Sequence, residues 1–261
     1  MRAAVKALSV LSTLLWLVLI GLVVSSFYFA ATGGVIIYVG EPYVEVEEGL
    51  LAYVAYVHVR NHGLLSLQRL ILNGTLVDSN GHLVGWNETL VGSVGPGREE
   101  TIRYAIYLNL TEIGSDPELS YLMEEATTLN MTVVASVVYS YLFPLRVKAS
   151  YPVEWSPPLE NLHIIGPNLS ITGTQMSLGI YFTNKAVFDL RGDVDVHIYD
   201  AGGDLLGSRT TGISVQRGEK ANIQVVISLD KPLKPPISGT YVIVFRTDMF
   251  RYEVVGEYEL G

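Results

Sequence analysis

The stretch that decides the fold is VHVRN at residues 57–61, because the chain repeats it as IYFTN at residues 180–184. Apolar residues alternate with more polar ones in both runs, which is the period-two pattern of a β-strand with one buried face. Each run ends on an asparagine, Asn61 or Asn184, a residue type that favours turns. The pair predicts two similar β-rich units in one chain.

Further pairs of turns follow the two runs in the same order. DSNG at 78–81 corresponds to DAGG at 200–203, VGPG at 94–97 to VQRG at 215–218, and SYLFP at 140–144 to TDMFR at 247–251. A shared order of strands and turns indicates a duplication. We therefore predict two domains, at residues 35–155 and 156–261. The prolines of WSPPL at 155–159 predict a short, stiff joint between them.

The segments between the turns have the composition of antiparallel strands. In DVDVHIY at 193–199, Val194, Val196 and Ile198 fall on one face, and the polar side chains fall on the other. Turn signals recur every 8 to 12 residues, a spacing typical of sandwiches, whereas parallel sheets need helices between strands. The sequence predicts a mainly β fold with two tandem antiparallel β-sandwich domains of the immunoglobulin or fibronectin III type.

One helix is predicted, as an insertion near residues 116–126 of the first domain. Asp116 suits the cap and Pro117 the first helical position, and the apolar residues that share one face are Leu119, Leu122, Met123 and Ala126. The second domain has KPLKPPISG at 231–239 instead, which cannot be helical. Such an apolar stripe plugs the end of a sandwich or contacts a partner, and plugging is the preferred interpretation.

The beginning of the chain carries a long uncharged segment. Residues 7–40 contain no charge, and residues 14–24 are wholly apolar. As a helix, residues 8–31 would reach roughly 36 Å, more than a hydrocarbon core of about 30 Å. Arg2 and Lys6 precede the segment, and the positive-inside rule keeps basic flanks in the cytoplasm. We predict a cytoplasmic N-terminus at 1–6, a transmembrane signal anchor at 7–31 in the lipid bilayer, and both domains outside the cell membrane.

A cleaved signal peptide is the alternative, with cleavage near Ser25 and Ser26. Either way the rest of the chain is exported. Beyond residue 31 it has 15 basic and 26 acidic residues, a formal net charge of −11, which excludes binding of nucleic acid by charge. The chain has no cysteine, which excludes disulfides and thiolate metal sites.

The repeated pattern also resembles a known domain family. A strand that ends on Asn, a second strand, an Asp-x-x-Gly turn and a Val-x-Pro/Arg-Gly turn are similar to the type 2 late-embryogenesis-abundant domain, also called the WHy domain. Residues 45–110 and about 170–230 carry this pattern, and it is similar in general form to fibronectin III modules. The family usually has Asn-Pro where this chain has Asn61-His62 and Asn184-Lys185. The resemblance implies β-sandwiches behind an N-terminal membrane anchor and no catalytic residues.

No catalytic, cofactor or metal residues are predicted. The chain lacks the motifs of serine hydrolases, P-loop proteins and zinc proteases, so we predict a protein that is not an enzyme. His58 and His62 would lie about 13 Å apart on an extended strand, too far to share an ion. The aspartates that could suggest calcium are interpreted as solvated strand and turn residues: Asp193, Asp195, Asp200 and Asp204. Arg191-Gly192-Asp193 spells an adhesion tripeptide, and we interpret it as a strand entry.

Five of the ten asparagines lie in Asn-x-Ser/Thr glycosylation motifs, which is more than the Ser and Thr content predicts. They are Asn73, Asn87, Asn109, Asn130 and Asn168. The alternative is that strands and turns simply favour Asn and Thr. Asn87 is the preferred site, because its surroundings are rich in turn-forming residues.

These observations predict a membrane-anchored, non-enzymatic component of the cell envelope, outside the cytoplasm, that acts as a structural, scaffold or protein-binding part. Exposed edge strands are the expected route to protein partners, because their unpaired backbone groups accept a further strand. Two alternatives stay open: a secreted binding protein released by signal cleavage, and an envelope hydrolase with unrecognised residues.

Overall fold

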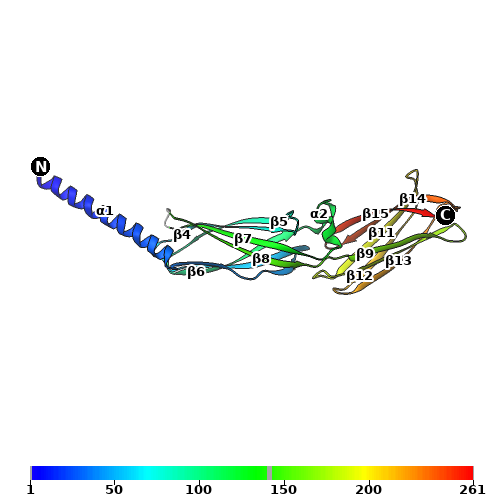
Figure 1. Cartoon of the computed structure of the whole chain (residues 1–261), viewed down its shortest axis with the longest axis horizontal. Helices are drawn as coiled ribbons and strands as arrows, with labels where there is room; N and C mark the ends of the chain where they lie inside the picture. Colours follow the sequence, from blue (N-terminus) through cyan, green and yellow to red (C-terminus); the bar gives the residue numbers. More distant parts are fainter. Residues whose placement is uncertain (1, 140–142, 261) are drawn as a thin grey trace.

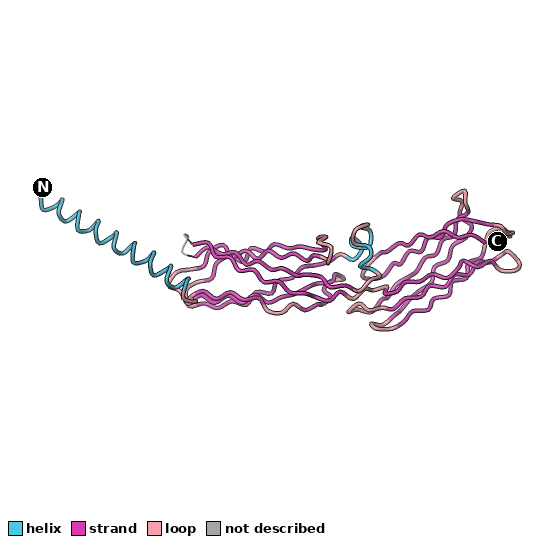
Figure 2. The backbone as a smooth tube through the Cα atoms, in the orientation of Figure 1, coloured by secondary structure: helices cyan, strands magenta, loops and turns pink. Residues whose placement is uncertain are grey.

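The computed structural model describes residues 2–139 and 143–260, and within the first helix it describes the side chains of residues 11–21, 23–25 and 28. Helix α1 (Arg2–Ala31) is followed by two β-rich units that lie one behind the other along an elongated molecule (Figure 1). Strands make up most of each unit (Figure 2). The prediction of a mainly β fold is confirmed.

The first unit contains two antiparallel sheets. One consists of β1 (Val35–Val39), β2 (Tyr43–Glu47), β3 (Leu50–Asn61) and β6 (Arg98–Leu108); β1 and β2 pair with successive halves of one edge of β3, and β6 pairs with the other edge. The other sheet has the order β5 (Leu83–Val94), β4 (Leu67–Val77), β7 (Thr127–Tyr139), β8 (Phe143–Trp155).

The second unit repeats this arrangement. One sheet has the order β13 (Lys220–Ser228), β10 (Gln175–Thr183), β9 (Glu160–Leu169), and the other has the order β12 (Leu205–Val215), β11 (Leu190–Asp200), β14 (Ile237–Thr247), β15 (Arg251–Leu260). Strand β10 takes the place of β3, with β13 in place of β6. Four antiparallel sheets with buried residues between them form two sandwich-like units, here called the first and second sandwich.

The matched asparagines build the same turn in both sandwiches. The Nδ2 group of Asn61 donates to the carbonyls of Leu65, Val94 and Gly95 at 2.9, 3.1 and 3.1 Å. The Nδ2 group of Asn184 donates to the carbonyls of Phe188 and Val215 at 2.8 and 3.2 Å. Each Oδ1 accepts the amide two residues further on, and both side chains are fully buried. The repeat thus marks a buried amide that joins the strand end to the neighbouring turn.

The Asp-x-x-Gly turns are duplicated as well. Oδ1 of Asp78 accepts the amides of Asn80 and His82, both at 2.8 Å, and Asp200 does the same with Gly202 and Asp204. Asp78 is the more buried of the two and also accepts the hydroxyl of Tyr121 at 2.8 Å. Burial acts to raise the pKa of Asp78, but the hydrogen bonds from Tyr121 and His82 outweigh it and hold that pKa below its usual value.

The core follows the predicted alternation along the strands. Val194, Val196 and Ile198 of β11 are all fully buried, as expected from their shared face. Asp195, on the other face, is nevertheless largely covered, because Arg246 pairs with it at 2.6 Å and Thr210 donates to it at 2.7 Å. A buried carboxylate paired in this way is satisfied and offers no free ligand.

Glycine explains the Arg-Gly-Asp tripeptide. Gly192 lies in β11 with φ of +150°, and a Cβ atom there would collide with the carbonyl oxygen of Arg246 on β14. Only glycine allows the two backbones to approach this closely. The tripeptide therefore belongs to the pairing of two strands at the start of β11, as the strand-entry interpretation predicts.

The predicted insertion is helical, but its α-helix does not lie at 116–126. The α-helix in this insertion is α2 (Leu110–Ser115), which ends before Asp116, and a 3₁₀ helix, η1 (Ser120–Met123), follows it. Asn109 caps α2 by accepting the amide of Thr111 at 3.1 Å, and its Nδ2 donates to Glu112 at 3.0 Å. This N-cap starts the helix earlier than Asp116, whose Oδ1 instead accepts the amide of Glu118 in a turn.

Helix α1 covers the predicted anchor at residues 7–31. Within the part of the chain that the structure describes, no helix is both long enough and apolar enough to cross a membrane. Several side chains of residues 7–31 lie outside the described residues.

Candidate functional site: the joint between the sandwiches

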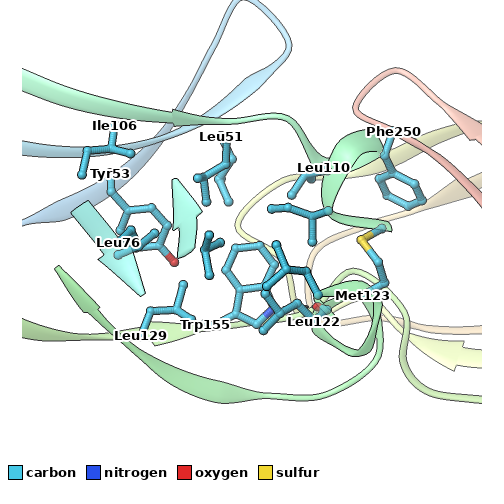
Figure 3. Packing of buried hydrophobic residues seen from close by; sticks show 14 of the residues in the cluster. Leu51, Tyr53, Leu76, Ile106, Leu110, Leu122, Met123, Leu129, Trp155 and Phe250 are labelled. Carbon is cyan, nitrogen blue, oxygen red and sulfur yellow. Dashed lines mark hydrogen bonds between the residues drawn. The ribbon is translucent and has the colours of Figure 1, made fainter. Parts of the chain in front are cut away.

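The two sandwiches meet at a joint built from three segments far apart in sequence. The insertion with α2 and η1 comes from the first sandwich, the linker at 156–159 follows β8, and the start of β15 comes from the second sandwich. Figure 3 shows Leu110, Leu122, Met123 and Trp155 gathered in one place, with Phe250 on the side of the second sandwich.

Apolar packing fills the joint. Trp155 is only 2% exposed, and Leu122, Met123 and Leu159 are fully buried. The indole Nε1 of Trp155 donates to the carbonyl of Leu122 at 2.6 Å, which ties the end of β8 to the insertion. The buried apolar residues of both sandwiches form one continuous cluster through this region. The plugging interpretation of the apolar stripe fits Leu119, Leu122 and Met123, whereas Ala126 is exposed.

Hydrogen bonds reinforce the joint. The amide of Leu159 donates to the carbonyl of Met123 at 3.0 Å, and the amide of Lys185 donates to Pro157 at 3.1 Å. From β15, the amide of Arg251 donates to Oγ1 of Thr111 at 2.9 Å. Backbone groups that bond across a boundary fix its geometry more closely than exposed side chains do.

Tyr252 of β15 holds the insertion from the other side. Its hydroxyl donates to Oε1 of Glu124 at 2.8 Å, and a Cβ atom at Gly114 would lie 2.9 Å from its ring. Burial raises the pKa of Tyr252 well above its usual value, and the bond to Glu124 adds to the shift. The hydroxyl therefore stays protonated and continues to donate at any physiological pH.

The joint has little room for a ligand. Beside Trp155 there is a cavity of about 20 Å³, lined also by Tyr53 and Phe188. A space of this size holds about one water molecule.

The structure places the predicted glycosylation sites in different environments. Asn130 and Asn168 are exposed on β7 and β9, Asn73 is half-buried on β4, and Asn109 is the exposed cap of α2. Asn87 does not lie in a turn: it is half-buried in the middle of β5, and its Nδ2 donates to the carbonyl of Ala105 at 2.8 Å. A glycan on this nitrogen would have to displace that bond, so the reason for preferring Asn87 is wrong.

The histidines and aspartates considered for metal binding are not brought together. His58 stacks on Tyr38 with ring centroids 4.4 Å apart and bonds to Thr101. Among the described residues, no group of three or more His, Cys, Asp or Glu side chains is arranged to hold a metal ion.

Comparisons with known proteins do not identify a family. No family model matches the chain, and no curated protein sequence matches it. Solved structures with a distant likeness include red sea bream transglutaminase, with TM-score 0.33, 14% identity, and coverage of 87% of this chain and 31% of that one. Others are a structure named pT26-6p, with TM-score 0.30, 8% identity and 86% and 65% coverage, and Bacteroides uniformis beta-glucuronidase, with TM-score 0.29, 14% identity and 80% and 27% coverage.

The chain thus spans less than a third of the transglutaminase and glucuronidase chains that it resembles. Likenesses at these TM-scores and identities say nothing about activity.

Proposed function

We propose that this protein is a non-enzymatic spacer of the cell envelope, tethered through residues 7–31, whose two sandwiches hold the far end of the molecule at a fixed distance. The observation that carries the proposal is the continuous apolar core through the joint, with Trp155 buried at its centre. Tandem domains joined by small polar interfaces move relative to each other, whereas a large apolar interface holds them in one orientation. A joint whose buried centre holds a cavity of only about 20 Å³ suits a part that keeps two domains in a fixed orientation.

The export half of the proposal is supported by the charge pattern. Basic residues precede the uncharged segment, and the domains behind it are acidic. The resemblance to WHy domains, which often follow a membrane anchor, favours the same arrangement. Protein partners are proposed to bind at exposed edge strands.

Stiffness of the joint predicts a narrow distance distribution between the sandwiches. Since the chain has no cysteine, the exposed pair Ser93→Cys and Arg209→Cys would carry spin labels at these two positions alone. Pulsed electron paramagnetic resonance on the full chain in detergent is expected to give a single peak. A control pair within the first sandwich, Ser93→Cys with Thr128→Cys, gives the width of the distance distribution that the flexibility of the labels alone produces. A distribution across the joint several times wider than the control would contradict a rigid spacer.

Tethering predicts that the native protein stays with membranes after alkaline carbonate extraction and is released only by detergent. Its intact mass should include residues 1–31, and added mass in hexose steps would reveal glycosylation. Release by carbonate, or a mature N-terminus near Phe27, would contradict the tethered spacer and favour the secreted binding protein.

A further inference from the structure

A surface cleft of about 460 Å³ lies on the first sandwich, beside the joint. It lies where the start of β5 and the end of β6 meet α2. Its lining is Leu50, Leu83, Val84, Gly85, Trp86, Tyr107, Asn109, Glu112, Ile113, Asp116 and Leu119. We call it the Trp86 cleft. Its size lies in the range of sites that bind small groups or side chains.

Aromatic and aliphatic side chains form an exposed apolar rim. Trp86 is 63% exposed, Tyr107 is 41% exposed, and Leu83 beside them is 51% exposed. Tryptophan at an open site loses the burial that normally stabilises it. In the described part of the chain, the Trp86 ring stacks on no other ring. An exposed Trp and Tyr together are typical of the anchor positions of binding surfaces.

The charged side chains that line the cleft are acidic. Glu112 and Asp116 contribute carboxylates, and the lining contains no lysine or arginine. Within the described residues, neither carboxylate forms a salt bridge. By contrast, Glu45 and Glu47, on β2 of the sheet that carries Tyr107, are both paired with Arg103, which also donates to the hydroxyl of Tyr107 at 3.4 Å. Glu118, which is 73% exposed, adds a third carboxylate near Asp116, and its nearest basic group is the imidazole of His82 at 4.0 Å.

We infer that the Trp86 cleft binds a lysine or arginine side chain from a partner protein. The faces of Trp86 and Tyr107 attract a cation through their ring quadrupoles, and Glu112 and Asp116 supply the opposite charge at the same place. The formal net charge of −9 steers a basic partner toward the molecule. The occupant is therefore a basic segment of a protein.

The inference does not depend on the spacer proposal, and it conflicts with one predicted modification. Asn109 lines the cleft and its Nδ2 is bonded to Glu112 at 3.0 Å. A glycan on Asn109 would cover the cleft. The site and glycosylation of Asn109 therefore exclude each other on one molecule, and binding is measured on protein made without glycosylation.

The test uses the full chain in detergent and three capped peptides with the sequence Gly-Ser-Gly-X-Gly-Ser-Gly, where X is arginine, lysine or neutral citrulline. The indole resonance of Trp86 in a nitrogen-15 spectrum reports binding. We expect saturable shifts with the arginine and lysine peptides, at least about fivefold weaker binding with citrulline, and weakening by added salt.

Variants separate the cleft from general acidity. Trp86→Ala, and the double variant Glu112→Gln with Asp116→Asn, should each weaken binding of the arginine peptide at least about fivefold. Because Trp86→Ala removes the indole reporter, binding to that variant is followed through the resonances of the peptide. Glu253→Gln, an exposed carboxylate on β15, is the matched control and should leave binding unchanged. The inference would be overturned if the citrulline peptide bound as tightly as the arginine peptide, or if Glu253→Gln weakened binding as much as the cleft variants do. Saturable binding of maltotriose at the cleft, without binding of the basic peptides, would also overturn it.

Discussion

Asn61→Ala is expected to lower the free energy of unfolding of the first sandwich by about 3 to 5 kcal/mol. The substitution removes four hydrogen bonds from a fully buried side chain and leaves three carbonyls and the amide of Gly63 without that partner. Each buried group left unsatisfied costs about 1 to 3 kcal/mol, and partial entry of water offsets some of the loss. Urea unfolding followed by circular dichroism would measure the change.

Asn184→Ala should repeat the effect in the second sandwich, with a smaller loss because it removes three bonds instead of four. Asn61→Asp keeps the shape and loses the donors, so it should be at least as damaging as alanine. Asn222→Ala is the matched control, since Asn222 is exposed on β13 and makes a single side-chain contact, with Gln224. If Asn61→Ala and the control were equally mild, the buried amide would not hold the turn.

Trp155→Ala is expected to have the second large effect, a loss of about 4 kcal/mol. A buried tryptophan contributes its transfer free energy and fills a cavity that the joint cannot close, and the carbonyl of Leu122 loses the indole donor. Because Trp155 lies between the sandwiches, the variant should also broaden the spin-label distance across the joint.

Trp86→Ala provides the control for this prediction, because it makes the same chemical change at an exposed site. Its effect on unfolding should stay within about 0.5 kcal/mol. A Trp155→Ala protein with unchanged stability and an unchanged distance distribution would show that the joint is held by the backbone bonds alone.

The sequence predicts this fold well wherever local patterns repeat. The two asparagine turns and the two aspartate turns could be found by comparing the chain with itself, since each is a local hydrogen-bonding device. The helical insertion was misplaced because two caps compete within seven residues. Asp116 with Pro117 resembles a start, but Asn109 caps the helix by accepting the amide of Thr111 and starts it earlier, with its own Nδ2 bonded to Glu112.

The joint and the Trp86 cleft could not be predicted in the same way. Residues near 50, 83–86, 107 and 109–119 form the cleft, and only the packing of β5 and β6 against the insertion brings them together. Asn87 illustrates a related difficulty. Its neighbour Gly85 is of a type common in turns, yet here both residues belong to an edge strand. The environment of such a strand depends on the sheet opposite.

The insertion also gives the molecule a polarity. The first sandwich supplies α2 and η1, and β15 of the second sandwich contacts them. At the equivalent place the second sandwich has the exposed loop around Lys231 and Pro236. An array lengthened by further duplication would stay straight only if each added copy except the last had its own insertion. The number of insertions, and not the number of sandwiches, would therefore set the length of a stiff array.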